Sequence, residues 1–82
     1  MLSELQTARK VIGVKQSRKA IRDGLAQKVV VAKDAEVRVT RPILALCEER
    51  GVPVEEAETM AELGKAAKID IGAAVVAVLK EI

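Results

Sequence analysis

The chain has 82 residues, which suffice for one small domain and are too few for two, so residues 1–82 are expected to form a single unit. The absence of Phe, Tyr and Trp excludes RNA-binding modules that stack bases on aromatic side chains, while the absence of His and the presence of only one Cys exclude imidazole catalysis and an intramolecular disulfide. The net charge is +2, but residues 9–33 carry +7 and residues 48–62 carry −5, an asymmetry typical of proteins that dock a polyanion with one side.

The predicted elements begin with a short helix and a short strand. Residues 3–6, with the sequence Ser-Glu-Leu-Gln, have the form of a capping box, and the helix that they start is expected to end near Arg9. Residues 11–14 then indicate a brief strand that breaks at Gly13.

A second helix and a buried strand follow. Residues 15–23 have helical periodicity, and Gly24 is expected to cap the helix at its C-terminus. Residues 28–32, KVVVA, are apolar on both sides, a pattern that predicts a strand covered on both faces.

The next segment predicts a loop, a helix and an edge strand. The loop is expected at residues 34–39, and the helix is expected to open at Thr40 and Pro42 and to end at Gly51. Residues 52–56 predict a strand at the edge of the sheet, because the proline within them cannot donate to a ladder of hydrogen bonds.

The last two predicted elements complete an alternating order. Residues 59–62, Thr-Met-Ala-Glu, form a second capping box for a helix that ends near residue 67, and residues 73–79, AAVVAVL, predict a central strand. Alternating helices and strands with short connections predict an α/β fold, a three-layer α/β/α sandwich around a small mixed sheet.

The location of the protein is also constrained by its apolar segments. The first ten residues lack the apolar run of a signal peptide, and no stretch approaches the ~18 apolar residues of a membrane span. We therefore expect a cytoplasmic monomer that has no membrane partner.

Basic residues recur at positions i, i+3, i+4 and i+7 of the second predicted helix and are Lys15, Arg18, Lys19 and Arg22. This spacing places all four on one face, named here the basic ridge, opposite the side that Ala20 and Ile21 bury. A solvated surface explains such a face as well, because an amphipathic helix needs a polar side. However, like charges at this spacing repel, and an anionic partner would offset the repulsion.

Gly13 precedes the basic ridge and makes the start of that helix a candidate anion site. A residue without Cβ lets another backbone approach closely and leaves the first helical amides open to a phosphate. An ordinary turn glycine is the alternative interpretation. The spacing GxxxxGK[ST] of a nucleotide-binding loop is absent.

A third candidate segment, residues 63–72 with the sequence LGKAAKIDIG, is a helix end followed by a loop and carries Ile69, Asp70 and Ile71 just before the last strand. Two isoleucines in a loop are commonly core residues, but if exposed they would pack on an extruded base. Two other features are given no functional role. Cys47 fits an apolar pattern and is expected to be a buried core thiol, and the glutamates at 55, 56 and 58 are expected to form a solvated acidic edge, so neither a metal nor a cofactor is assigned.

Three segments, GVKQSRKAI, VVVAKDAE and LGKAAKIDIGAAVVAV, together resemble the kink-turn-binding ribosomal protein family, which includes the archaeal large-subunit protein L7Ae and small bacterial members. The resemblance covers almost the whole chain in order. It implies an α/β/α sandwich that binds RNA kink-turns, which are helices bent tightly at a bulge beside sheared G·A pairs. It also implies a non-catalytic protein, associated with the ribosome or with another structured RNA.

The resemblance further implies roles for individual residues. The family pattern G-x-[N or K]-[E or Q]-x-x-K falls on Gly13, Lys15, Gln16 and Lys19, whose helix is expected to enter the widened major groove together with Arg18. Lys15 and Gln16 replace the archaeal Asn-Glu pair, so the specificity of pairing is expected to differ. Val14 stands where many relatives have threonine, which would remove a hydroxyl N-cap worth roughly 1 kcal/mol.

By the same resemblance, Ile69, Asp70 and Ile71 form the loop that covers a flipped-out bulge nucleotide, and Lys33 contacts the RNA backbone. Two other functions remain alternatives. Relatives of this fold also serve as protein-interaction adaptors, for which the acidic segment 48–62 would be the working surface. An enzyme is the least supported alternative, because the chain lacks His and a phosphate-binding loop.

Overall fold

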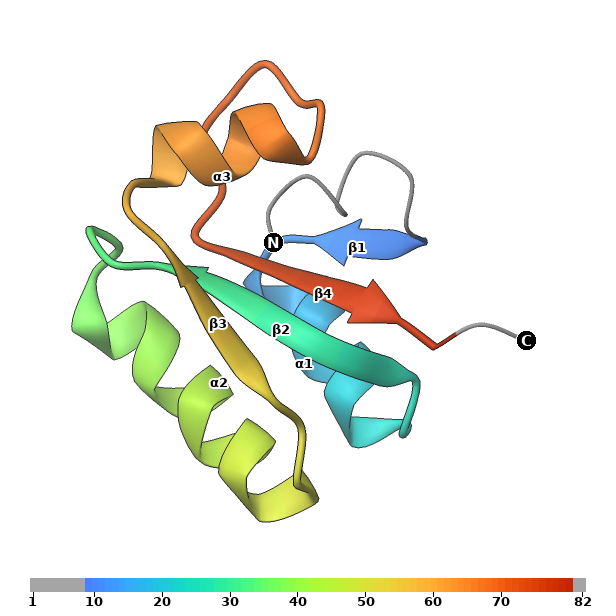
Figure 1. Ribbon diagram of the computed structural model, residues 1–82. Coiled ribbons are helices and arrows are strands. Elements are labelled where there is room, and N and C mark those ends of the chain that lie inside the picture. Colours follow the sequence, from blue (N-terminus) through green and yellow to red (C-terminus); the bar gives the residue numbers. More distant parts are fainter. Residues whose placement is uncertain (1–8, 81–82) are drawn as a thin grey trace.

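A computed structural model describes residues 9–80 of the chain. Its elements in order are β1 (Lys10–Ile12), α1 (Val14–Arg22), β2 (Ala26–Ala32), α2 (Val37–Arg50), β3 (Val54–Ala57), α3 (Met60–Ala66) and β4 (Val75–Leu79). The four strands form one sheet in the order β1-β4-β2-β3 (Figure 1). Strand β4 runs antiparallel to both β1 and β2, whereas β3 runs parallel to β2, so the predicted mixed sheet is confirmed.

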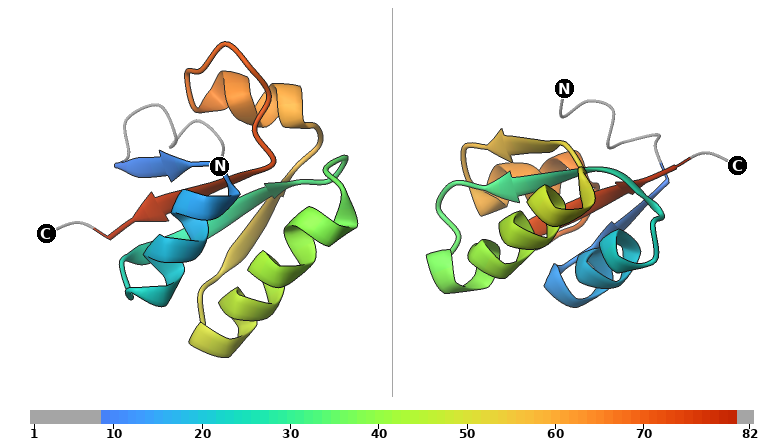
Figure 2. Two further views of the ribbon diagram at one scale, coloured as in Figure 1. Left: turned by 180° about the vertical axis from the view of Figure 1, so that it is seen from behind. Right: turned by 90° about the horizontal axis from the view of Figure 1, so that it is seen from below.

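The helices lie on both faces of this sheet. Helices α1 and α2 cover one face and α3 covers the other, as the views from behind and from below show (Figure 2). The predicted three-layer α/β/α sandwich is therefore confirmed. The helix expected at residues 3–9 lies, apart from Arg9, outside the described residues.

The two inner strands separate two apolar clusters. Along β2, Val29 and Val31 face α1 and α2, while Val30 and Ala32 face α3. All four are buried, as are the residues from Val75 to Val78 of β4. The two apolar runs that predicted covered strands thus form the centre of the sheet.

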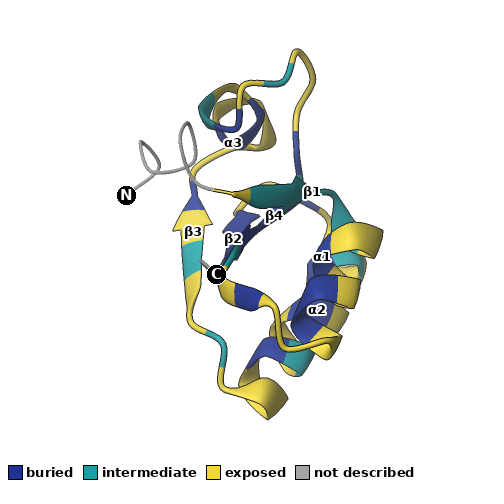
Figure 3. Ribbon diagram, turned by 90° about the vertical axis from the view of Figure 1, so that its right-hand side faces the viewer, coloured by how far each residue is buried: buried dark blue, intermediate teal, exposed yellow. Residues whose placement is uncertain are grey.

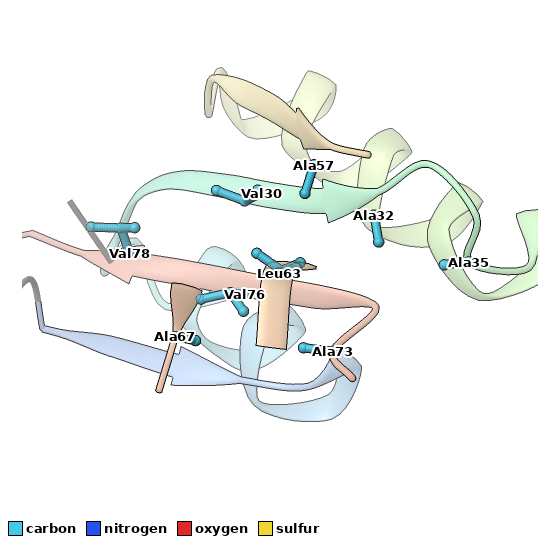
Figure 4. Close-up of a cluster of buried hydrophobic side chains, with 9 residues drawn as sticks. All are labelled: Val30, Ala32, Ala35, Ala57, Leu63, Ala67, Ala73, Val76 and Val78. Atoms are coloured by element: carbon cyan, nitrogen blue, oxygen red, sulfur yellow. The ribbon is translucent and has the colours of Figure 1, made fainter. Parts of the chain in front are cut away.

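The cluster under α3 consists mainly of small side chains. Leu63 is the largest of its buried residues and lies over the sheet near Val30 and Val76, and the same cluster contains the alanines at 32, 35, 57, 67 and 73 (Figure 4). Alanines at these positions leave the short helix close to the sheet. The opposite cluster contains the bulkier Ile21 and Ile43 together with Cys47, which is buried as predicted.

Several predicted caps and the edge strand are confirmed. Gly24 and Gly51 follow α1 and α2 with φ angles of 75° and 69°, the left-handed conformation that glycine adopts readily. The Thr59 hydroxyl accepts a hydrogen bond from the Glu62 amide at 3.0 Å and caps α3. Strand β3 lies at the edge of the sheet, directly after Pro53.

The start of α2 differs from the prediction. The helix begins at Val37, so half of the segment expected as a loop at residues 34–39 is helical, and Pro42 lies inside the helix rather than at its first turn. The Glu36 carbonyl already accepts from the amides of Val39 and Thr40, at 2.9 and 3.1 Å. A proline deprives the carbonyl four residues earlier of its usual donor, here that of the exposed Arg38, where water can replace the missing donor.

Candidate functional site

The chain between β1 and α1 turns at Gly13, which is the N-cap of α1 and has a φ of 100°. Its amide donates to the Val75 carbonyl at 2.9 Å, and its carbonyl accepts from the Ser17 amide at 3.0 Å. The amide of Gly13 is thus committed to β4. The amides of Val14, Lys15 and Gln16 belong to the first turn, where an α-helix provides no intrahelical acceptor, and they are the ones that an anion would meet.

Val14 does not occupy the capping position that the sequence interpretation gave it. It is the first residue of α1, and its partly buried side chain packs against the cluster between α1, α2 and the sheet. Among residues 9–80, no side-chain hydrogen bond caps the N-terminus of α1. Gly13 is the N-cap instead, with a φ of 100°, so a threonine at position 14 would not supply the expected hydroxyl cap.

The outward face of α1 carries the predicted basic ridge. The ridge residues and Gln16 are exposed, whereas Ser17, Ala20 and Ile21 are buried, as the helical spacing predicted (Figure 3). A shallow hollow of about 290 Å³ lies along this face and is lined by Lys15, Gln16, Arg18, Lys19 and Arg22.

Most of the charge on this ridge has no ion-pair partner in the described part of the chain. Within residues 9–80, Lys15, Arg18 and Lys19 form no ion pair with a carboxylate, and Arg22 lies 4.0 Å from the neighbouring Asp23. The first turn of α1 contains no acidic residue, so Lys15 adds its charge to the positive end of the helix dipole. The N-terminal half of this face is therefore the part of α1 that attracts an anion most strongly.

The loop between α3 and β4 separates its two isoleucines. Ile71 is 75% exposed, while Ile69 is partly buried and packs against the cluster under α3. Asp70 is exposed between them. Of the two interpretations offered for this loop, a core residue describes Ile69 better and an exposed apolar contact describes Ile71.

Three predicted segments meet at one end of the sheet. β4 begins there after the loop, β2 ends there before Lys33, and α1 begins there at Gly13 (Figure 1). Two hydrogen bonds hold the segments together, one from the Gly13 amide to the Val75 carbonyl and one from the Ala32 amide to the Ala74 carbonyl, both at 2.9 Å.

Lys28 and Lys33 belong to the basic segment of the sequence but face the acidic one. Lys33 donates to Glu58 at 3.1 Å, and this hydrogen bond, together with the charges of Glu58 and Glu56, raises the pKa of Lys33. Lys28 donates to Glu55 at 2.6 Å. The basic surface is therefore narrower than the charge count along the chain suggested, and it centres on α1.

Two further lysines, Lys65 and Lys68, belong to the third candidate segment, but the sequence interpretation gave them no role. Both are exposed at the end of α3, next to the loop that carries Ile71. Lys68 is distinguished by its backbone conformation, with a φ of 63°, which the local sequence pattern did not predict.

No helix within residues 9–80 is long and apolar enough to cross a membrane. In the same part of the chain, no group of three His, Cys, Asp or Glu residues is placed to hold a metal ion.

Comparison with known proteins identifies relatives along almost the whole chain. The chain is 42% identical over 76 residues to an RNA-binding protein of Geobacillus thermodenitrificans and 43% identical to the RNA-binding protein YbxF of Geobacillus stearothermophilus, with 93% of each chain covered in both cases. Among solved structures, a protein of unknown function from Bacillus halodurans superposes with a TM-score of 0.88 at 25% identity, covering 96% of this chain and 83% of that one. A 15.5 kD RNA-binding protein of Giardia lamblia superposes with a TM-score of 0.87 at 23% identity, over 98% of this chain and 68% of that one, and shares the fold.

The family resemblance that the three sequence segments indicated is confirmed by a family model that matches residues 2–81. The chain belongs to the ribosomal protein L7Ae/L30e/S12e/Gadd45 family.

Proposed function

We propose that this protein binds RNA without catalysing a reaction, and that its target is a kink-turn. The observation that carries the proposal is the basic ridge, where Lys15, Arg18 and Lys19 are exposed beside the first-turn amides of α1 and have no ion-pair partner within residues 9–80. RNA offers the phosphates and guanine acceptors that such a surface binds. The names of the bacterial relatives, which are RNA-binding proteins, support the same class of ligand.

The proposed roles follow the position of each side chain. Lys15 and Lys19 donate to guanine O6 and N7 or to phosphates, Gln16 donates and accepts at base edges, and Arg18 adds a phosphate contact. Gly13 allows the close approach of the RNA to the first turn of α1. All of these groups lie along the outward face or the start of one helix, which suits a single groove of the RNA.

The loop before β4 supplies a second kind of contact. An extruded bulge nucleotide would rest on Ile71, whose side chain is 75% exposed, while Ile69 anchors the loop to the core and Asp70 stays at its rim. Lys33 lies at the same end of the sheet and reaches the RNA backbone only by exchanging its hydrogen bond with Glu58 for a phosphate. The protein would then act by stabilising the bent RNA over its extended form, on the ribosome or on another structured RNA.

The acidic edge is a weaker basis for function. Glu55 and Glu58 are already paired with Lys28 and Lys33, so this edge presents less free charge than its sequence suggests. An adaptor function that depends on it is not proposed.

The test compares two RNAs that differ only at the kink. Wild-type protein is titrated with an RNA that contains tandem sheared G·A pairs beside a bulge, and with the same RNA in which those pairs are replaced by Watson–Crick pairs. We expect binding to the first RNA to be tighter by about a hundredfold or more at physiological salt. Equal affinities for the two RNAs would refute kink-turn recognition, and no measurable affinity for either would refute RNA binding altogether.

A further inference from the structure

The three helices of the described chain end in the same way but with different residues. After α1 and α2 the left-handed position is filled by Gly24 and Gly51, and after α3 it is filled by Lys68, with a φ of 63°. Within residues 9–80, Lys68 is the only residue other than glycine that has a positive φ.

The hydrogen bonds at these helix ends are equivalent. The amide of Lys68 donates to the Lys65 carbonyl and that of Ile69 donates to the Gly64 carbonyl, both at 3.0 Å. After α1, the amide of Gly24 donates to the Ile21 carbonyl and that of Leu25 to the Ala20 carbonyl, at 3.2 and 2.9 Å. Glycine would therefore close α3 with the same bonds, and the geometry of the turn does not require a lysine.

The backbone conformation itself disfavours lysine. An L-residue with a Cβ is strained in the left-handed region. The attraction between the lysine cation and the C-terminal end of this seven-residue helix offsets only part of the free energy of that strain. Residues held in such conformations concentrate at ligand-binding positions, where the side chain contacts a ligand and is not needed to stabilise the fold. The side chain of Lys68 is exposed and forms no ion pair within residues 9–80, so no contact in this part of the chain accounts for a lysine at this position.

The neighbouring loop is held firmly against α3. A Cβ at Gly64 would overlap the carbonyl oxygen of Ile71, so the loop backbone lies directly on the helix. The Ala73 amide donates to the Met60 carbonyl at 3.0 Å, and the Met60 amide donates to Asp34 at 2.8 Å. Lys68 and the exposed Ile71 are therefore presented together, three residues apart, on a fixed backbone.

We propose that Lys68 binds a phosphate of the RNA strand whose extruded base rests on Ile71, with Lys65 adding a second cation one turn earlier. This inference rests on the proposed RNA-binding function and deepens it, because it assigns a phosphate site to the end of α3, on the face of the sheet opposite the basic ridge (Figure 2). A base that leaves its stack places its own phosphates beside the pocket or surface that receives it. An ammonium group next to an apolar contact matches that combination of chemistry.

The experiment uses three single substitutions in the full chain. Lys68→Gly removes both the strain and the charge, Lys68→Gln removes the charge and keeps the strain, and Lys80→Gln is the matched control, because Lys80 is exposed at the far end of β4 from the loop. Thermal unfolding is recorded for each protein. Affinities for the kinked RNA and its Watson–Crick counterpart are measured at several salt concentrations.

We expect Lys68→Gly to unfold about 4 °C higher than the wild type and Lys68→Gln to unfold at or below the wild-type temperature. Both should bind the kinked RNA about threefold to tenfold more weakly, and the slope of log K against log salt should fall by about one. Lys80→Gln should leave affinity within about twofold of the wild type.

Three results would overturn the proposal. The first is unchanged RNA affinity in both Lys68 variants. The second is an equal loss of RNA affinity in Lys80→Gln, which would indicate a general effect of charge. The third is an unfolding temperature of Lys68→Gly no higher than that of the wild type, which would mean that the backbone at Lys68 is not strained. Failure of kink recognition is read separately. If the wild type binds the two RNAs alike while both Lys68 variants lose affinity for each of them, the phosphate contact stands and the kink-turn does not.

Discussion

The lysines of α1 and those at positions 28 and 33, in and just after β2, come from the same basic stretch of sequence, but they are placed differently. Lys15 and Lys19 project from a helix with no carboxylate partner among the described residues, whereas Lys28 and Lys33 are held by Glu55 and Glu58 of the neighbouring β3 region. The cause is topological. Strand β3 pairs in parallel with β2 and brings the acidic segment beside it, while α1 packs mainly on α2 and β4. Charge counted along a chain therefore overstates the charge that is free to bind a polyanion.

The largest expected difference is in RNA affinity. Lys19→Ala should weaken binding to kinked RNA about tenfold or more, or ~1–3 kcal/mol, because its ammonium is free to donate to the RNA. Lys33→Ala should weaken it by less than about threefold, because the wild-type lysine must first give up Glu58. Titration of both variants at one salt concentration measures the difference. Equal losses would show that the hydrogen bond to Glu58 does not limit Lys33.

A smaller effect is expected on the free energy of unfolding, when the ion pair between Lys28 and Glu55 is broken. The hydrogen bond from Lys28 lowers the pKa of Glu55 below its ordinary value. A carboxyl whose pKa is lower in the folded than in the unfolded protein stabilises the fold above the unfolded value, about 4.3, and this contribution is lost as the pH falls through the folded value.

Glu55→Gln should therefore reduce the free energy of unfolding at pH 7, and the difference from wild type should shrink at acidic pH, as the Glu55 carboxylate of the folded protein becomes protonated. The side chain of Glu55 is 39% exposed, so solvent screening limits the expected loss to about 0.5–1 kcal/mol. Urea unfolding at the two pH values measures it. A difference of the same size at both pH values would mean that the charge of Glu55 is not its cause, and RNA affinity should stay at the wild-type value.

The smallest effect is expected on the inward face of α1. Ser17 is fully buried, and its hydroxyl has no hydrogen-bond partner in the part of the chain that the structure describes. Removing an unsatisfied buried hydroxyl is neutral or favourable, so Ser17→Ala should leave the free energy of unfolding unchanged or raise it by up to about 1 kcal/mol, without changing RNA affinity. A loss of more than about 1 kcal/mol in urea unfolding would mean that the hydroxyl has a partner, such as a buried water.

Much of the architecture was predictable because its signals are local. The runs KVVVA and AAVVAVL predicted the two covered strands, and the spacing between Lys15 and Arg22 predicted the exposed face of α1. The capping residue Thr59 and the glycines after α1 and α2 were also identified. In each case a short pattern is set by helix or strand geometry alone.

The remaining features depend on contacts between distant segments. Pro42 favoured a helix start near residue 42. The helix begins earlier because the Glu36 carbonyl accepts hydrogen bonds from the amides of Val39 and Thr40. The pairing of Lys28 with Glu55 requires the register of two parallel strands, which no local pattern fixes. In the same way, the different exposure of Ile69 and Ile71 follows from how closely the loop backbone lies on Gly64.

The hydrogen bond between the Gly13 amide and Val75 has a consequence for how any ligand is held. It fastens the beginning of α1 to the first residue of β4, and the loop that carries Ile71 runs directly into the same strand. The start of α1 and the Ile71 loop are thus both attached to β4, one of the two central strands, which fixes the distance between them. Association then orders little of the polypeptide, and the entropy cost of adapting shape falls on the partner.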